Sequence, residues 1–154
     1  MTRRIHVDDL PRLVGAVLGE SEPLEVTQEQ VNLFADATHD HQWLHVDPVR
    51  AAEGPFGGTI AHGFLTLALL PALFERTVTL EGAETFVNYG LNRLRFPAPV
   101  LVGSTVRLKV SLNDVKEVPG GVELALGFEI GEPGAAKPAA VGESLLRAYP
   151  DGHL

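Results

Sequence analysis

Asp40 and His45 are the two side chains of this sequence whose types and spacing best fit proton transfer. They stand five residues apart in the polar segment DATHDHQWLHVDP, residues 36–48. Because neighbours on one helix face are three or four residues apart, a loop has to bring this pair together. A carboxylate and an imidazole that converge on one water form a general acid–base pair, since imidazole gains and loses protons near neutral pH. Aspartate is also frequent in loops for its turn geometry, so the two residues alone leave a structural role open.

A second segment, GGTIAHG at residues 57–63, leads into an apolar run that predicts a helix. The first N–H groups of a helix have no partner within it and lie at the positive end of its dipole. Such donors can hold an oxygen that gains negative charge, and glycine at position 63 would let a ligand approach closely. Gly63 fits helix–sheet packing equally well, and both interpretations stay open. We expect His62 to be a structural, hydrogen-bonded residue and not a second base.

Asn88 is the candidate substrate contact outside these two segments. In the strand-like stretch VNYGLN, residues 87–92, small or polar residues alternate with apolar ones. A small polar face on a buried strand can line a cavity, although a solvated face fits the same pattern. The other acidic residues near the pair have simpler interpretations: Asp47 as a helix cap and Asp36 on the outer face of its helix.

The elements that must position these residues begin with helices. Thr27 and Gln30 form a capping-box pattern, which predicts a helix that ends near Thr38. Asp47–Pro48 predicts the start of another short helix, through about Glu53. Residues 61–74 are apolar on almost every face, so that helix should be surrounded by other structure, and Pro71 should bend or end it. A short helix over residues 8–18 and a strand over residues 22–26 are expected before them.

Everything after Glu84 has the two-residue period of antiparallel strands. Apolar residues alternate with polar or small ones at 105–112 and again at 122–130. Turn signals separate these stretches, and a last strand is expected over about 139–149. Helices first and a meander of strands afterwards predict an α+β fold, with one buried helix against a curved antiparallel sheet.

The composition narrows the possible partners. A chain of 154 residues predicts one domain over 1–154, and the absence of cysteine excludes disulfides, thiol catalysis and cysteine-bound zinc. The net charge is −8 without a basic run, so neither nucleic acid nor an anionic membrane is an expected partner. The longest apolar run is too short to span a bilayer, and no signal-peptide pattern opens the chain. We expect a cytoplasmic protein.

The joined motifs resemble the MaoC-like dehydratase family, which includes the (R)-specific enoyl-CoA hydratases. The resemblance rests on Phe34–Ala35, on Asp40-x4-His45-x-Asp47-Pro48, on GGTIAHG, and on RFPAPV at 95–100 with Gly103. It covers about residues 25–112. Members often have Asn-Pro where this chain has Gln42–Trp43, and in this respect the chain resembles the nodulation-protein-like branch. Trp43 is then expected to pack as a wall of the loop.

The resemblance implies a hot-dog fold, usually as a homodimer, with Asp40 and His45 as the catalytic pair. It implies a hydratase or dehydratase of fatty acid metabolism, which adds water to trans-2-enoyl-CoA or removes it from (R)-3-hydroxyacyl-CoA. Gly63 N–H would hold the thioester oxygen. The substrate is an acyl-CoA thioester, and neither a cofactor nor a metal is expected.

Three other functions stay open. A non-catalytic acyl-thioester-binding protein has no need for both Asp40 and His45, and an acyl-CoA thioesterase would cleave the bond that the hydratase-like loop is expected to leave intact. Hot-dog folds serve several functions, so the fold alone does not decide. A metal site built from His39, His41 and His45 is the weakest alternative, because no HExxH spacing supports it.

Overall fold

The computed structural model describes residues 2–150, and its centre is a curved sheet of long strands. The four longest are β5 (Thr85–Arg95), β6 (Thr105–Val118), β7 (Gly121–Gly131) and β8 (Ala140–Tyr149). The strand order is β2-β6-β7-β8-β5, and all of these neighbours run antiparallel. The predicted alternation on β6 is confirmed by four side chains that are fully buried: Val106, Leu108, Val110 and Leu112.

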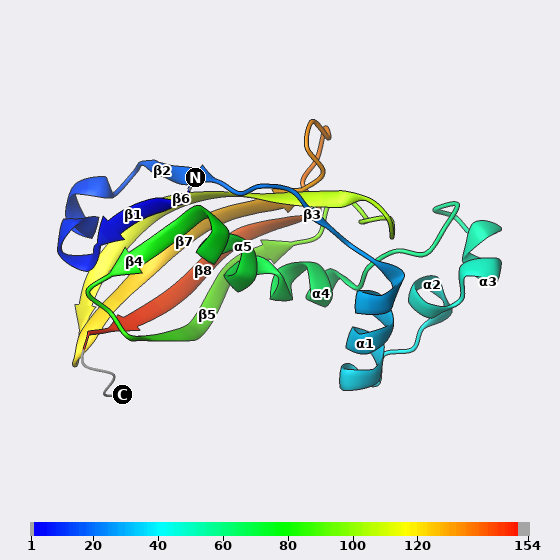
Figure 1. Ribbon diagram of the computed structural model, residues 1–154, viewed down its shortest axis with the longest axis horizontal. Coiled ribbons are helices and arrows are strands. Elements are labelled where there is room, and N and C mark those ends of the chain that lie inside the picture. The colour runs from blue at the N-terminus through cyan, green and yellow to red at the C-terminus, as the bar shows by residue number, and fades with distance from the viewer. Residues whose placement is uncertain (1, 151–154) are drawn as a thin grey trace.

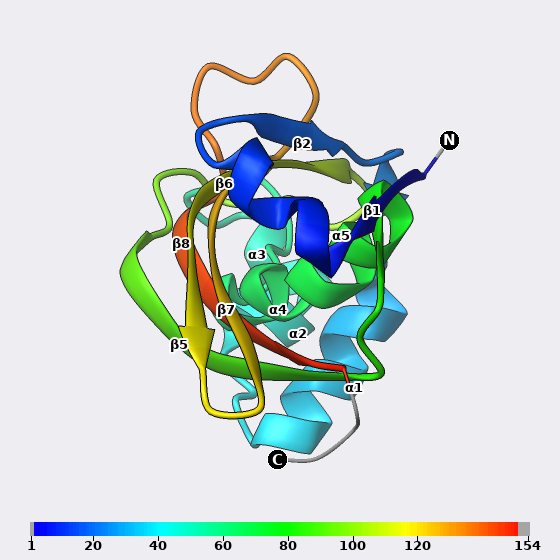
Figure 2. The ribbon, with the colours of Figure 1, turned by 90° about the vertical axis from the view of Figure 1, so that its left-hand side faces the viewer.

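Two short helices fill the hollow of this sheet, α4 (Gly63–Ala68) and α5 (Leu70–Thr77). Figure 2 looks along the sheet and shows both helices enclosed by its curve. Leu69 separates them, and Pro71, which has no N–H to donate, stands in the first turn of α5. The expectation that Pro71 bends the helix or ends its first segment is confirmed, because the first segment ends just before it, at Leu69. Leu65 and Leu73 are buried, but Phe64 is 67% exposed, so the helix is not covered on all sides within one chain.

The N-terminal segment confirms the strand expected over residues 22–26, as β3, and adds two strands, β1 and β2, that the sequence pattern did not indicate. β1 (Arg3–His6) pairs in parallel with β4 (Val78–Glu81), while β2 (Val17–Glu20) and β3 (Leu24–Glu25) pair with β6. The helix expected over residues 8–18 is wrong in type and length, because the structure has a 3-10 helix, η1 (Val7–Leu13). Gly15, at φ +88°, then turns the chain so that β2 can pair with β6.

Three helices lie beyond one end of the sheet, α1 (Gln28–Thr38), α2 (Trp43–Val46) and α3 (Pro48–Ala52) (Figure 1). Both halves of the predicted capping box are present: Gln30 N donates to Thr27 Oγ1 and Thr27 N donates to Gln30 Oε1, each at 3.2 Å. Asp47 caps α3 as predicted, its Oδ1 accepting from Arg50 N at 3.1 Å. The stretch expected to be loop between α1 and α3 contains the extra turn α2, which carries His45.

The curved sheet and the two helices in its hollow, α4 and α5, form the hot-dog architecture that was predicted. Within residues 2–150, no helix is long and apolar enough to cross a membrane.

Candidate active site

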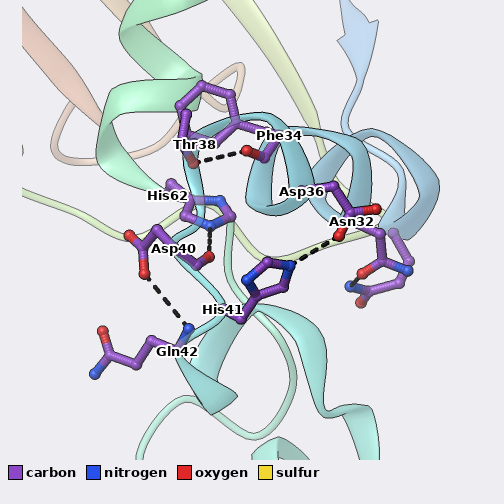
Figure 3. A network of polar contacts seen from close by, with 9 residues as sticks. Asn32, Phe34, Asp36, Thr38, Asp40, His41, Gln42 and His62 are labelled. Carbon is purple, nitrogen blue, oxygen red and sulfur yellow. Dashed lines mark hydrogen bonds and ion pairs between the residues drawn. The ribbon is translucent and has the colours of Figure 1, made fainter.

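Asp40 lies where the chain leaves α1 and turns back. The turn is made by His39, which has left-handed backbone geometry at φ 61°. The Asp40 side chain is exposed, and its Oδ1 accepts a long hydrogen bond from Gln42 N at 3.4 Å (Figure 3). His41, the next residue, turns away and pairs with Asp36 at 2.8 Å. The loop therefore separates neighbouring titratable groups and leaves the Asp40 carboxylate available.

His45 is held in one orientation by the main chain. It is 8% exposed, and its Nδ1 lies 2.7 Å from the carbonyl oxygen of Ile60. Because a carbonyl only accepts, Nδ1 carries the proton, and in the neutral ring Nε2 keeps its lone pair. The turn itself is anchored to α1: Gln28 Nε2 donates to His45 O at 2.7 Å, and Thr59 Oγ1 donates to Gln28 Oε1 at 2.6 Å.

The structure brings the predicted pair together. A carboxylate oxygen of Asp40, a ring nitrogen of His45 and a ring nitrogen of His62 all lie within 4.8 Å of one another. One water can bridge groups at such a separation. His62 was expected to be structural, and its Nε2 is indeed 2.9 Å from Asp40 O. The expectation missed its contact with His45, because residues seventeen apart show no periodicity that would pair them.

The same three residues form the one group within residues 2–150 that has enough donors for a metal ion. This group differs from the weak alternative of His39, His41 and His45. The rings of His45 and His62 are stacked, with centroids 3.8 Å apart and planes 27° apart. Nitrogen lone pairs lie in the ring plane, so two nearly parallel rings do not direct theirs at one point, as a metal would require.

Trp43 packs against the helix that follows it. The guanidinium carbon of Arg50 lies 4.3 Å from the centroid of the Trp43 ring. A Cβ at Gly54 would lie 3.0 Å from the same ring, so glycine allows the ring to pack closely there. Trp43 thereby joins α2 to α3 and supports the turn that carries His45.

Gly63 is the first residue of α4, directly after His62. A Cβ at this position would lie 3.0–3.2 Å from three ring carbons of Phe96. Glycine therefore permits close packing here, and the same position presents a first-turn N–H that the helix leaves without an acceptor. Both interpretations of Gly63 keep a physical basis.

Asn88 lies on the wall of a cavity of about 310 Å3 between α5, β4 and strands β5, β7 and β8. Most of the lining is apolar, for example Phe74, Leu126 and Leu146, and Ser144 adds a hydroxyl. Asp40, His45 and Gly63 are not among the lining residues. The cavity and the acid–base pair are thus two separate features of the single chain, connected by the α4–α5 helix.

The small polar face expected over residues 87–92 is interrupted, and for Asn92 the alternative of a solvated face is confirmed. The pairing of β5 with β8 shifts register between Asn88 and Gly90, which inserts an extra residue. Asn92 instead donates to Glu143 Oε1 at 2.8 Å, and Glu143 precedes the cavity residue Ser144 on its strand. Adjacent strand residues point to opposite faces, so Asn92 lies on the outer face.

Comparison with known proteins supports the family that the motifs suggested. Residues 9–127 match the model of the MaoC like domain. The chain is 54% identical over 142 residues to 3-hydroxyacyl-thioester dehydratase Z of Mycobacterium tuberculosis, covering 92% of this chain and 94% of that protein. It is 53% identical over 128 residues to nodulation protein N of Rhizobium leguminosarum bv. viciae, covering 82% and 79%.

A solved structure agrees with this assignment. The (R)-hydratase from A. caviae involved in PHA biosynthesis superimposes with a TM-score of 0.68 at 26% identity, covering 82% of this chain and 92% of that one. The fold and the site define a hot-dog protein with an aspartate–histidine pair at the end of its sheet. The chain belongs to the MaoC-like domain family.

Proposed function

We propose that this protein is a hydro-lyase that adds water to trans-2-enoyl-CoA or removes it from (R)-3-hydroxyacyl-CoA. The observation that carries the proposal is the convergence of Asp40 and His45 within 4.8 Å in a chain of this family. Similarity to a 3-hydroxyacyl-thioester dehydratase and to an (R)-hydratase supports the reaction class.

The pair acts on one water held between the Asp40 carboxylate and His45 Nε2. Both atoms accept hydrogen bonds, so they orient the water with its oxygen lone pair toward C3 of the enoyl group. As the oxygen bonds to C3, one member of the pair takes a proton from the water. The pair then delivers a proton to C2, which leaves Asp40 and His45 as they began. Dehydration runs the same steps in reverse.

The negative charge that develops on the thioester oxygen needs a donor. We assign this role to Gly63 N–H, because the first N–H groups of a helix have no acceptor within it. The glycine also keeps the approach to this N–H free of a side chain.

The acyl chain is proposed to occupy the cavity beside α5. Its walls are mainly apolar, as burial of a hydrocarbon requires, and Leu70, Pro71 and Phe74 of the α4–α5 helix line it. Gly63 begins α4 and Leu70 begins α5, so the two consecutive helices run from the proposed oxyanion donor to the cavity. Asn88 is the polar contact on the cavity wall.

A homodimer joined at β5 is part of the proposal. β5 ends the strand order of the sheet, and Phe86, Tyr89 and Leu91 are exposed along it. Unpaired edges with apolar side chains invite pairing with another strand, and a second copy of β5 would cover them. Light scattering is expected to give twice the mass of one chain at micromolar concentration. A species with the mass of one chain would contradict the dimer.

The cytoplasmic location stays a prediction.

The test is incubation with crotonyl-CoA and with longer trans-2-enoyl-CoAs. We expect loss of the enoyl absorbance and an (R)-3-hydroxyacyl-CoA product. Release of free CoA with the enoyl group intact would identify a thioesterase instead. Saturable binding without conversion of any chain length would identify a non-catalytic binding protein.

A further inference from the structure

The segment Thr59–His62 contacts both members of the acid–base pair from one side. Ile60 O accepts from His45 Nδ1 at 2.7 Å, and two residues later His62 Nε2 donates to Asp40 O at 2.9 Å. The segment itself is fixed to the stretch before β6 in the same chain, because Ala61 N donates to Val100 O at 2.8 Å. The segment Thr59–His62 therefore positions both members of the pair, although Asp40 follows α1 and His45 lies in α2.

The His62 side chain contacts both members of the pair. It is 2% exposed and stacks on the His45 ring at a centroid distance of 3.8 Å. Phe34 of α1 also packs against it, with ring centroids 4.8 Å apart. The ring consequently limits tilting of His45, while its hydrogen bond holds the main chain of Asp40.

The hydrogen bonding of His62 defines its protonation. Because Asp40 O only accepts, Nε2 carries the proton. Nδ1 is buried and has no hydrogen-bond partner among the described residues. The hydrogen on Nε2 is thus engaged by Asp40 O, and the Nδ1 lone pair is buried, so neither ring nitrogen of His62 is free for proton exchange.

We propose that His62 is a positioning residue of this active site, which orients Asp40 through its N–H and His45 through its ring face without exchanging protons with the substrate. This inference rests on the proposed hydratase function. It assigns a separate task to each feature of the side chain, so the two tasks can be removed one at a time.

Two variants separate the tasks. His62→Phe keeps a ring against His45 and removes the N–H to Asp40 O. His62→Gln keeps an N–H at about the place of Nε2 and removes the ring. We expect His62→Phe to lower kcat about 10–100-fold with KM within about twofold, because displacement of a reacting group by about 1 Å costs up to about 100-fold. His62→Gln should recover part of this loss.

A matched control tests whether any damage to this core has the same effect. Phe34→Leu removes packing against His62 but leaves both of its contacts with the pair. It should lower the melting temperature and keep kcat per folded molecule within about twofold of the wild type. Equal kcat losses in Phe34→Leu and His62→Phe would make His62 a packing residue and overturn the inference.

The pH dependence of kcat distinguishes positioning from proton transfer. Both His62 variants should keep the same rising and falling limbs as the wild type at a lower plateau. Loss of one limb would make His62 a proton-transfer group. Wild-type kcat per folded molecule in both variants would also overturn the inference. A wild type inactive on every 2-enoyl-CoA would instead defeat the proposed function.

A measurement on the wild type alone covers the case in which the variants do not fold. Nitrogen-15 chemical shifts of the histidine rings report which nitrogen is protonated. At pH 7, His62 should show hydrogen on Nε2 and none on Nδ1. A protonated Nδ1 or a cationic ring would contradict the assignment.

Discussion

Two groups of buried titratable side chains in this molecule are held in opposite ways. On the sheet, Glu123 is 4% exposed, and each of its carboxylate oxygens has a cationic partner: Arg147 Nε at 2.8 Å and Lys116 Nζ at 3.0 Å. In the site, the His45 and His62 rings each use one nitrogen on a main-chain carbonyl. Among residues 2–150, no charged side chain forms a hydrogen bond or ion pair with either ring.

The difference separates a structural group from a reactive one. Arg147 and, after it, Lys116 hold the pKa of Glu123 below its ordinary value, against the opposing effect of burial. A carboxylate fixed in this way stays ionised and has no atom left for proton transfer. Among residues 2–150, neither Asp40 nor His45 is part of an ion pair like that of Glu123, and each keeps an atom for the water. Burial alone therefore does not mark a catalytic group; an unused atom in a fixed orientation does.

The largest effects are expected from the pair itself. Asp40→Asn or His45→Gln should lower kcat about 10²–10⁴-fold, because each removes a general acid or base. The fold should be retained, and circular dichroism with a thermal melt checks this. Glu123→Gln is the matched control, with unchanged kcat per folded molecule. Near-normal activity in Asp40→Asn or His45→Gln would remove that residue from the mechanism.

Gly63→Ala should have the next largest effect. The new Cβ would lie 3.0 Å from the Phe96 ring, which is 40% exposed and can move by a few tenths of an ångström. We expect little change in melting temperature. Turnover should fall up to about 10²–10³-fold, because the Cβ would keep the thioester oxygen from the Gly63 N–H, and forfeiting an oxyanion donor costs about 2.7–4 kcal/mol.

A second substitution distinguishes the two roles of Gly63. Phe96→Ala in the Gly63→Ala background removes the ring that the Cβ meets. If turnover then returns to that of Phe96→Ala alone, Gly63 serves packing. If it stays low, the substrate itself needs the space at position 63.

How much of the fold and of the site could be predicted from the sequence depended on how many residues separate the groups that interact. The capping box at Thr27 and the cap at Asp47 were predictable, because their hydrogen bonds join residues three apart. The alternation on β6 was predictable because burial repeats every second residue. The resemblance supplied the catalytic roles of Asp40 and His45, which spacing alone left open.

Other features depend on pairings that leave no local pattern. The stack of His62 on His45 requires the bridge between Ile60 and Leu101, forty-one residues apart, to place its segment. The bulge at Asn88 depends on how β5 pairs with β8. It puts Asn92 on the opposite face of the strand from the one that the alternation of polar and apolar residues predicts. The parallel pairing of β1 with β4 likewise joins residues about seventy-five apart.

A smaller effect, on stability, is expected on the sheet. Glu123→Gln should lower the free energy of unfolding by about 1–3 kcal/mol at pH 7, since Arg147 and Lys116 lose their anionic partner. Because the folded pKa is depressed, this contribution is present above the ordinary value of 4.5 and is lost as pH falls through the folded pKa. Urea unfolding at pH 7, 5, 4 and 3, at one protein concentration, should show the two proteins converging at acid pH. A gap that stays constant down to pH 3 would contradict the ion-pair assignment.

The smallest effect is expected from chelation. EDTA should leave hydratase activity unchanged, because the three possible donors do not converge on an ion. The lone pairs of His45 and His62 lie in ring planes only 27° apart, and each ring already uses one nitrogen on a carbonyl. An ion bound to both rings would have to rotate at least one of them and break its main-chain hydrogen bond. The control is wild-type enzyme dialysed without EDTA, with activity and bound metal measured in both samples. Activity lost with EDTA and restored by zinc would show that the rings do rotate, and the pair would then have to be described as metal ligands instead of an acid–base pair that shares one water.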